Sequence, residues 1–259
     1  MINMREIEAM KELREIGEVF TSREAIRHLG LERGAFYYHL RRLQADGLVK
    51  KVGRSRYQLT LSNEEGMIDP FVLSSLMIRN SAVGYWTALN YYGFTEQMPR
   101  ITYVLTPTRG DYGELKKVHG IRAVIVDKRK FFGFNEVVIS GRTVRITTPE
   151  KTVADCLDRP KHCGGINEVV KAIKGGVDIN LVLDHVKRMG NGAALKRLAY
   201  LTDVLDIELD NKNEILEEIK KIKGYPLLDP THKRTGKWST RWGLILNVSN
   251  DSLEEDMWG

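Results

Sequence analysis

The sequence has few cysteines and no long apolar run. Its two cysteines, Cys156 and Cys163, are too few for the disulfide framework of a small secreted protein. No stretch of about 18 apolar residues offers a membrane span. The first residues are charged every few positions and contain no signal-peptide core. We therefore expect a cytoplasmic chain with reduced thiols and no membrane contact.

Low-complexity segments and internal repeats are also missing. Hydrophobic residues make up 42% of the 259 positions and charged residues 29%, which is typical of a globular protein with a buried core. This composition excludes a disordered or collagen-like chain. The length is typical of two domains rather than one.

Positive charge is concentrated in one stretch of the chain. Residues 23–60 contain nine lysines and arginines against three acidic residues. The resulting six net positive charges equal the net charge of the whole chain, so the remaining residues are balanced. Such a local excess of positive charge indicates a module that binds a polyanion.

The same stretch has the pattern of three helices followed by a basic hairpin. Thr21 and Glu24 form a capping box, and a turn is predicted over 53–55. Hydrophobic spacing predicts helices over 5–16, 23–29 and 33–45, and strands over 48–51 and 56–61. This order is that of a winged helix-turn-helix domain, which we place at 1–62. A purely structural three-helix cap with a solvated basic face is the alternative.

The third helix is predicted to have one apolar and one basic face. Phe36, Leu40 and Leu43 share a side, which we expect to face the core, with His39 packing at its edge. The opposite side is predicted to be the DNA-binding face of a recognition helix. Its residues are Gly34, Tyr37, Tyr38, Arg41 and Arg42, with Arg33 at the N-terminal flank. In a major groove, Arg41 or Arg33 can pair bidentately with guanine, and the tyrosines can reach thymine methyl groups.

The hairpin adds a second set of predicted DNA contacts. Its basic residues suit phosphates or an adjacent minor groove, and they supply affinity more than sequence choice. These wing residues are Lys50, Lys51, Arg54 and Arg56.

A polar linker over 63–69 leads to a larger domain, 70–259, with a frayed acidic tail over 249–259. Helices are predicted over 70–79, 81–92, 149–157, 165–174, 179–189, 191–206 and 211–222. Strands are predicted over 101–106, 121–126, 131–139, 142–146 and 242–248. The predicted fold class is therefore α+β, with an N-terminal winged helix-turn-helix and a larger mixed α/β C-terminal domain.

Motifs for catalysis are weak. Asp111, Glu114 and Lys116 resemble the acidic pair and lysine of a metal-dependent nuclease, but that chemistry needs Glu-x-Lys on a strand, and here it follows a turn-rich loop. Cys156, His162 and Cys163 lack the further ligands of a zinc site. The sequence has no P-loop, dinucleotide fingerprint or G-x-S-x-G motif. We predict no catalytic residue, no metal and no cofactor.

A second basic cluster lies near the C-terminus. Residues 231–241 contain Lys233, Arg234, Lys237 and Arg241, interleaved with Trp238 and followed by Trp242. Alternating basic and aromatic residues can bind nucleic acid or an acidic protein partner. A loop that leads into an edge strand, with both tryptophans in the core, is the structural alternative.

Two further segments resemble the AbiEi-type proteins, the antitoxin transcriptional regulators of AbiE phage-defence toxin–antitoxin systems. The segments are GYWTALNYYGFTEQMPRITYVLTPT and ITTPEKTVADCLDRPKHCGGINEVVKAI. The resemblance implies that the winged helix binds inverted repeats in the double-stranded DNA upstream of its own operon and represses it. It also implies that the C-terminal domain counteracts a nucleotidyltransferase-like toxin, in general without a stable complex. The cluster at 231–241 is then a candidate toxin surface.

Two other functions remain open from the residues alone. One is a stand-alone winged-helix regulator whose large domain senses a ligand or dimerises. The other is a nuclease that uses Asp111, Glu114 and Lys116. A nucleotidyltransferase gene directly downstream would favour the antitoxin, whereas metal-dependent cleavage of plasmid DNA would favour the nuclease.

Overall fold

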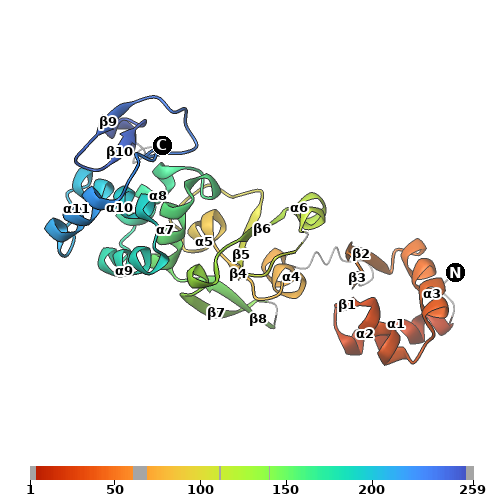
Figure 1. The fold of residues 1–259 in the computed structure, drawn as a ribbon. Helices are drawn as coiled ribbons and strands as arrows, with labels where there is room; N and C mark the ends of the chain where they lie inside the picture. Colours follow the sequence, from red (N-terminus) through yellow and green to blue (C-terminus); the bar gives the residue numbers. More distant parts are fainter. Residues whose placement is uncertain (1–3, 61–68, 111, 140, 255–259) are drawn as a thin grey trace.

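A computed structural model describes residues 4–60, 69–110, 112–139 and 141–254, which form a small N-terminal segment (4–60) and a larger C-terminal segment (69–254) (Figure 1). Helices and strands occur in both, so the prediction of a mixed α/β chain is confirmed. Within the described residues, no helix combines the length and the apolar character needed to cross a membrane. The N-terminal elements are α1 (Met4–Ile16), β1 (Val19–Thr21), α2 (Ser22–Leu29), α3 (Arg33–Ala45), β2 (Val49–Gly53) and β3 (Arg56–Leu59).

The N-terminal helices begin and end where local signals predicted. The Thr21 hydroxyl accepts a hydrogen bond from the Glu24 amide, and the Glu24 carboxylate accepts one from the Thr21 amide, so the predicted capping box is present. Helix α2 ends at Gly30, whose φ of 60° is left-handed. Phe36, Leu40 and Leu43 of α3 are buried in the N-terminal core, as predicted.

The strands of this segment form a three-stranded sheet in the order β1-β3-β2. Strand β1 was not predicted, because three residues between a turn and a helix cap carry no pattern of their own. The two-residue turn of the β2–β3 hairpin places Ser55 in the left-handed region, with φ 58°. The Ser55 carbonyl accepts a hydrogen bond from the Ser22 amide, which ties the hairpin tip to the start of α2.

The β2–β3 hairpin also packs against the C-terminal segment. Val52 is 1% exposed and shares an apolar cluster with Leu73 and Met77 of α4 (Pro70–Met77) and with Leu115 of α6 (Gly113–His119). The Arg56 guanidinium donates a hydrogen bond to the Met77 carbonyl. Most of the predicted linker, 63–68, lies outside the described residues.

The C-terminal segment is built around a five-stranded mixed sheet in the order β6-β5-β4-β8-β7. Tyr103 and Leu105 of β5 belong to the core that contains α5 and α7, whereas Val104 belongs to the cluster with α4 and α6. Because neighbouring side chains of a strand point to opposite faces, these helix pairs cover opposite faces of the sheet. The strands are β4 (Ala82–Val83), β5 (Thr102–Thr106), β6 (Ile121–Ile125), β7 (Phe134–Ile139) and β8 (Arg142–Thr147).

Beyond the sheet, the chain forms a helical layer and ends in a small hairpin. The helices predicted over 165–174, 179–189, 191–206 and 211–222 are each confirmed to within two residues. The elements are α5 (Tyr85–Tyr91), α7 (Pro149–Asp158), α8 (Ile166–Lys174), α9 (Ile179–Met189), α10 (Gly192–Val204), α11 (Lys212–Lys221), β9 (Lys237–Ser239), β10 (Leu244–Leu246) and α12 (Asn250–Glu254).

Several details of the C-terminal segment differ from the predictions. The helix predicted over 81–92 begins only at Tyr85, because Ala82 and Val83 form the central strand of the sheet. No element was predicted between the strands at 101–106 and 121–126, and helix α6 lies there. The acidic tail is not frayed over 250–254, because Leu253 is buried and the Asn250 side chain accepts a hydrogen bond from the Tyr200 hydroxyl at 2.6 Å. Residues 255–259 lie outside the described part of the chain.

Helix α7 carries a buried polar cluster. Lys151 and Asp155 are almost fully buried and form an ion pair with each other. The second Asp155 oxygen, the Tyr85 hydroxyl and His162 Nδ1 are buried without a hydrogen-bond partner among the described residues. Burial raises the pKa of Asp155 to about 6 and lowers the pKa of His162 to about 4, because desolvation disfavours the charged form of each group.

These two groups should act on stability in opposite directions as pH changes. Between about pH 4 and 6.5, unfolded His162 binds a proton that the folded form does not, so its contribution to the free energy of unfolding falls as the pH is lowered. Folded Asp155 keeps its proton up to about pH 6, so its contribution falls as the pH is raised. We expect wild type to lose up to roughly 3 kcal/mol in its free energy of unfolding relative to His162→Gln when the pH is lowered from 7.5 to 4.5. Urea unfolding at several pH values measures this change. If the free energies of unfolding of the two proteins changed in parallel with pH, the prediction would be wrong.

Candidate nucleic-acid interface

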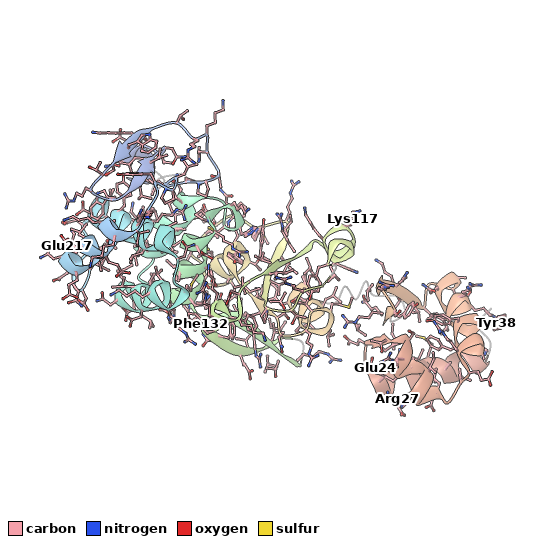
Figure 2. All side chains as sticks on the ribbon, viewed as in Figure 1. Glu24, Arg27, Tyr38, Lys117, Phe132 and Glu217 are labelled. Atoms are coloured by element: carbon pink, nitrogen blue, oxygen red, sulfur yellow. The ribbon has the colours of Figure 1, made fainter. Side chains whose placement is uncertain are left out.

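Helix α3 presents an exposed face with basic and aromatic side chains. Tyr38 is 60% exposed and points outward from the side of the N-terminal segment that lies away from the C-terminal segment (Figure 2). Arg41 lies one turn further along the same helix and is also exposed. Arg33, Gly34 and Arg42 are exposed too. An exposed arginine and tyrosine on one helix can reach base edges in a major groove.

Tyr37 differs from its prediction as a residue of the exposed face. It is half-buried, and its ring packs edge-on against Phe36 with 5.3 Å between centroids. The Arg33 guanidinium lies 5.9 Å from the centre of the Tyr37 ring. Tyr37 therefore lies at the boundary of the core, where it positions Arg33, and Tyr38 is the tyrosine that is free to meet a partner.

A basic cavity of about 640 Å³ lies next to this face, between α2, the start of α3 and the hairpin tip. Arg23 and Arg27 of α2 line it together with Arg33. Three guanidinium groups around one cavity suit phosphate oxygens, which arginine binds in bidentate fashion. Sequence reasoning did not include Arg23 and Arg27 among the site residues. Their signal was available, because both lie in the basic stretch and on the helix before the recognition helix.

The hairpin residues predicted to bind DNA fall into two groups. Lys50, Lys51 and Arg54 are exposed. Arg56 is half-buried, and one of its donors is used by the Met77 carbonyl. A DNA phosphate would thus meet Lys50, Lys51 and Arg54 first, and Arg56 has a second role in holding the hairpin against the C-terminal segment.

The nuclease-like and metal-like residues are arranged differently from what those chemistries need. Glu114 and Lys116 lie on helix α6, not on a strand, and Asp111 lies outside the described residues. Cys156 and Cys163 are buried and are not joined by a disulfide bond. Among the described residues, a different and exposed group, Glu12, Glu15 and His28, brings possible metal-ligand atoms within 4.8 Å of one another.

The C-terminal basic cluster divides between surface and core. Trp242 is 5% exposed and packs against Tyr200, whereas Trp238 is 59% exposed and lies 5.1 Å from Tyr225 between ring centroids. Arg241 contacts Asp203 at 3.6 Å and lies over the Trp242 ring. The remaining surface residues of the cluster are Lys233, Arg234, Lys237 and Trp238.

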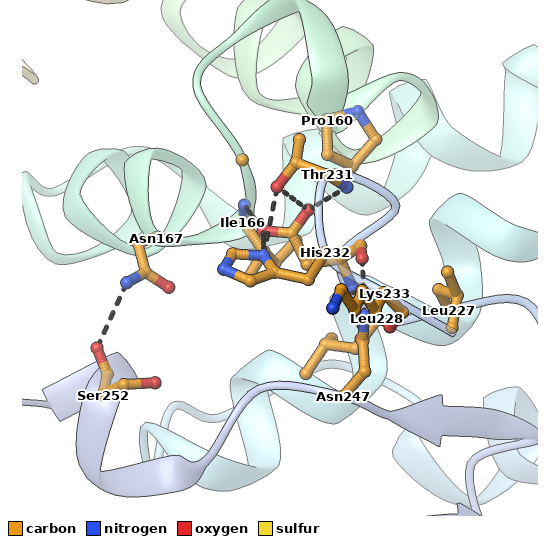
Figure 3. A network of polar contacts seen from close by, with 12 residues as sticks. Pro160, Ile166, Asn167, Leu227, Leu228, Thr231, His232, Lys233, Asn247 and Ser252 are labelled. Carbon is orange, nitrogen blue, oxygen red and sulfur yellow. Dashed lines mark hydrogen bonds and ion pairs between the residues drawn. The ribbon is translucent and has the colours of Figure 1, made fainter. Parts of the chain in front are cut away.

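A buried carboxylate fixes the backbone of this cluster. Asp229 accepts hydrogen bonds from the Ile166 amide at 2.8 Å and from the amide and hydroxyl of Thr231. The Asn247 side chain donates to the carbonyls of Asp229 and Lys233 (Figure 3). The loop is therefore tied to α8 and to the last strand, while its basic side chains extend into solvent.

Known proteins are similar to this chain in its fold and in the sequence of its N-terminal segment. No curated protein matches the sequence. The crystal structure of the RV2827C protein from Mycobacterium tuberculosis is similar, with a TM-score of 0.71 and 13% identity over 100% of this chain and 96% of that chain. At this identity the similarity shows the fold alone. Residues 8–60 match the model of a family described as a transcriptional regulator, AbiEi antitoxin. The suspected resemblance to the AbiEi antitoxin transcriptional regulators is thereby supported, over the segment that carries the basic face.

Proposed function

We propose that this protein is a sequence-specific DNA-binding autorepressor and the antitoxin of a phage-defence operon. The observation that carries the proposal is the exposed face of α3, with Tyr38 and Arg41, in the segment that matches the AbiEi family. In this proposal the N-terminal segment is a winged helix-turn-helix, and it acts in the cytoplasm on an inverted-repeat operator.

The proposed DNA contacts divide into two kinds. Arg41 and Tyr38 reach base edges from α3 and supply sequence choice. The cavity beside α2, with Arg23, Arg27 and Arg33, holds phosphates of the same duplex. Lys51 and Arg54 of the hairpin contact phosphates next to the groove.

The antitoxin activity is assigned to the C-terminal segment. Its proposed toxin surface is the group of exposed residues Lys233, Arg234, Lys237 and Trp238, whose backbone Asp229 holds in place. The proposed counterpart is a nucleotidyltransferase-like toxin that is countered without a stable complex. This function needs no catalytic residue, metal or cofactor.

Operator binding should depend strongly on salt, because neutralised phosphates release counterions. If five to eight basic side chains contact phosphate, the slope of log affinity against log salt is expected to be roughly −4 to −7. Lys51→Ala should weaken operator and unrelated DNA alike and reduce the slope by about 1. Fluorescence anisotropy on the chain's own promoter, from low to moderate salt, measures this. A slope near zero would remove the electrostatic basis of the proposal.

A second candidate function is a stand-alone regulator whose C-terminal segment senses a ligand. One observation favours it: a pocket lies where the β2–β3 hairpin meets the C-terminal segment. Ligand sensing by itself does not distinguish the two candidates, since an antitoxin can also respond to a ligand. Co-expression with the product of the downstream gene separates them, because only the antitoxin restores growth.

A further inference from the structure

A pocket of about 440 Å³ lies between the hairpin and the C-terminal segment. Lys51, Arg54 and Arg56 of the hairpin line one side, and Arg79, which follows α4, lines the other together with Tyr112. None of the described residues that line the pocket is acidic. Four cations from two parts of the chain therefore surround one space.

The walls of this pocket are held by contacts within the protein. Met77 and Leu115 are buried in the apolar cluster that joins the hairpin to α4 and α6. The Tyr112 hydroxyl donates to the Thr108 carbonyl at 3.1 Å, which fixes the ring. The Thr106 hydroxyl donates to the Arg79 carbonyl at 3.0 Å, which fixes the backbone of that arginine.

The chemistry of the lining selects an anion with more than one negative charge. Guanidinium groups match phosphate oxygens in bidentate geometry, and a tyrosine ring offers a flat face to a planar base. The pocket has the size of a small-molecule site. We propose that it binds a phosphorylated nucleotide, a nucleoside di- or triphosphate, as a regulatory ligand.

The consequence for DNA rests on the proposed function. Lys51 and Arg54 line the pocket and are also the hairpin residues proposed to contact DNA phosphates. A nucleotide that neutralises them removes those contacts, so ligand and operator oppose each other. Since binding linkage is reciprocal, the operator lowers the affinity for the nucleotide by the same factor. The nucleotide would relieve repression.

Arg79 lies outside the hairpin, so its replacement should affect nucleotide binding without removing a proposed DNA contact. Calorimetry with the full chain and either ATP or pyrophosphate is expected to show binding, which Arg79→Ala weakens by roughly 10- to 100-fold. At constant ionic strength, ATP is expected to lower the operator affinity of the wild type but not of Arg79→Ala. Without ATP the two proteins should bind the operator equally. The matched control is Lys187→Ala, an exposed cation on α9, which should behave as wild type throughout.

Each other outcome is informative. If Arg79→Ala weakens operator binding without ATP, the pocket holds a DNA phosphate and the proposal is wrong. The proposal is also wrong if neither ATP nor pyrophosphate binds to the wild type. It is likewise wrong if Arg79→Ala binds both ligands as tightly as the wild type does. If ATP binds through Arg79 but no operator is bound, the pocket assignment stands and the repressor function fails.

Discussion

Arg41→Ala is expected to lower operator affinity by about 1–3 kcal/mol, roughly 5- to 150-fold, through loss of a bidentate base contact. Affinity for unrelated DNA should change little, because the residue is proposed to recognise bases. Arg41 is exposed, so the variant should remain folded. Tyr38→Ala should act in the same direction. If Lys51→Ala or Arg54→Ala relaxed specificity while Arg41→Ala did not, the assignment of α3 to the groove would be wrong.

Paired assays extend this prediction to the two proposed activities. Arg41→Ala should derepress a promoter reporter yet still protect cells from the co-expressed toxin. The matched variant replaces Lys233, Arg234 and Lys237 by alanine and should impair protection without loss of operator affinity. Arg241 stays unchanged in it, because this arginine contacts Asp203 and Trp242. Loss of both activities in a folded Arg41→Ala protein would mean that toxin control depends on DNA binding.

Arg197→Leu is expected to destabilise the C-terminal segment by about 3–5 kcal/mol. Arg197 is buried, and its guanidinium donates hydrogen bonds to the carbonyls of Leu157, Leu227 and Leu228. Leucine fills much of the space but leaves three buried acceptors without this charged donor. Chemical unfolding followed by circular dichroism measures the change.

The controls for Arg197 separate charge from geometry. Arg197→Lys keeps the charge but not the fork that reaches three carbonyls, so it should fall between wild type and Arg197→Leu. Lys187→Leu removes an exposed cation and should stay within about 0.5 kcal/mol of wild type. A loss below 1 kcal/mol for Arg197→Leu would show that other donors replace the guanidinium.

Elements with strong local signals could be predicted from the sequence. Helix α3 occupies the predicted range 33–45, and α2 begins at its predicted capping box. Elements defined by distant partners could not. Ala82 and Val83 form a strand only because β5 and β8 lie on either side of them. Two residues carry too little periodicity to show this in advance.

The candidate site was predictable to a similar degree. The helical wheel placed Arg41 and Tyr38 on the exposed face of α3, where the structure has them, and it placed Tyr37 there as well. The burial of a boundary residue such as Tyr37 depends on how closely neighbouring helices approach. The sequence could not show that Trp242 is buried and Trp238 exposed, since only the fold shows that Trp242 contacts Tyr200. The contact between Arg56 and Met77 joins residues far apart in sequence and leaves no local signal.

Thr148-Pro149-Glu150-Lys151-Thr152, which lies in the second segment that resembles the family, is explained by folding. Thr148 caps α7, accepting a hydrogen bond from the Lys151 amide, and Pro149 lies in the first turn, where a missing amide hydrogen is tolerated. Lys151 pairs with buried Asp155. The family match itself falls on residues 8–60 and not on this motif.

The apolar contact between the hairpin and α4 limits which N-terminal segments of related proteins could replace this one to change the proposed DNA specificity. Val52 is buried against Met77 and Leu115, so a transplanted N-terminal segment must bring a side chain of the same shape to that position. A mismatched chimera would expose the cluster to water and leave the two segments free to reorient. Changing the exposed side chains of α3, the proposed recognition helix, leaves this apolar cluster intact and is therefore the better route to a new operator specificity.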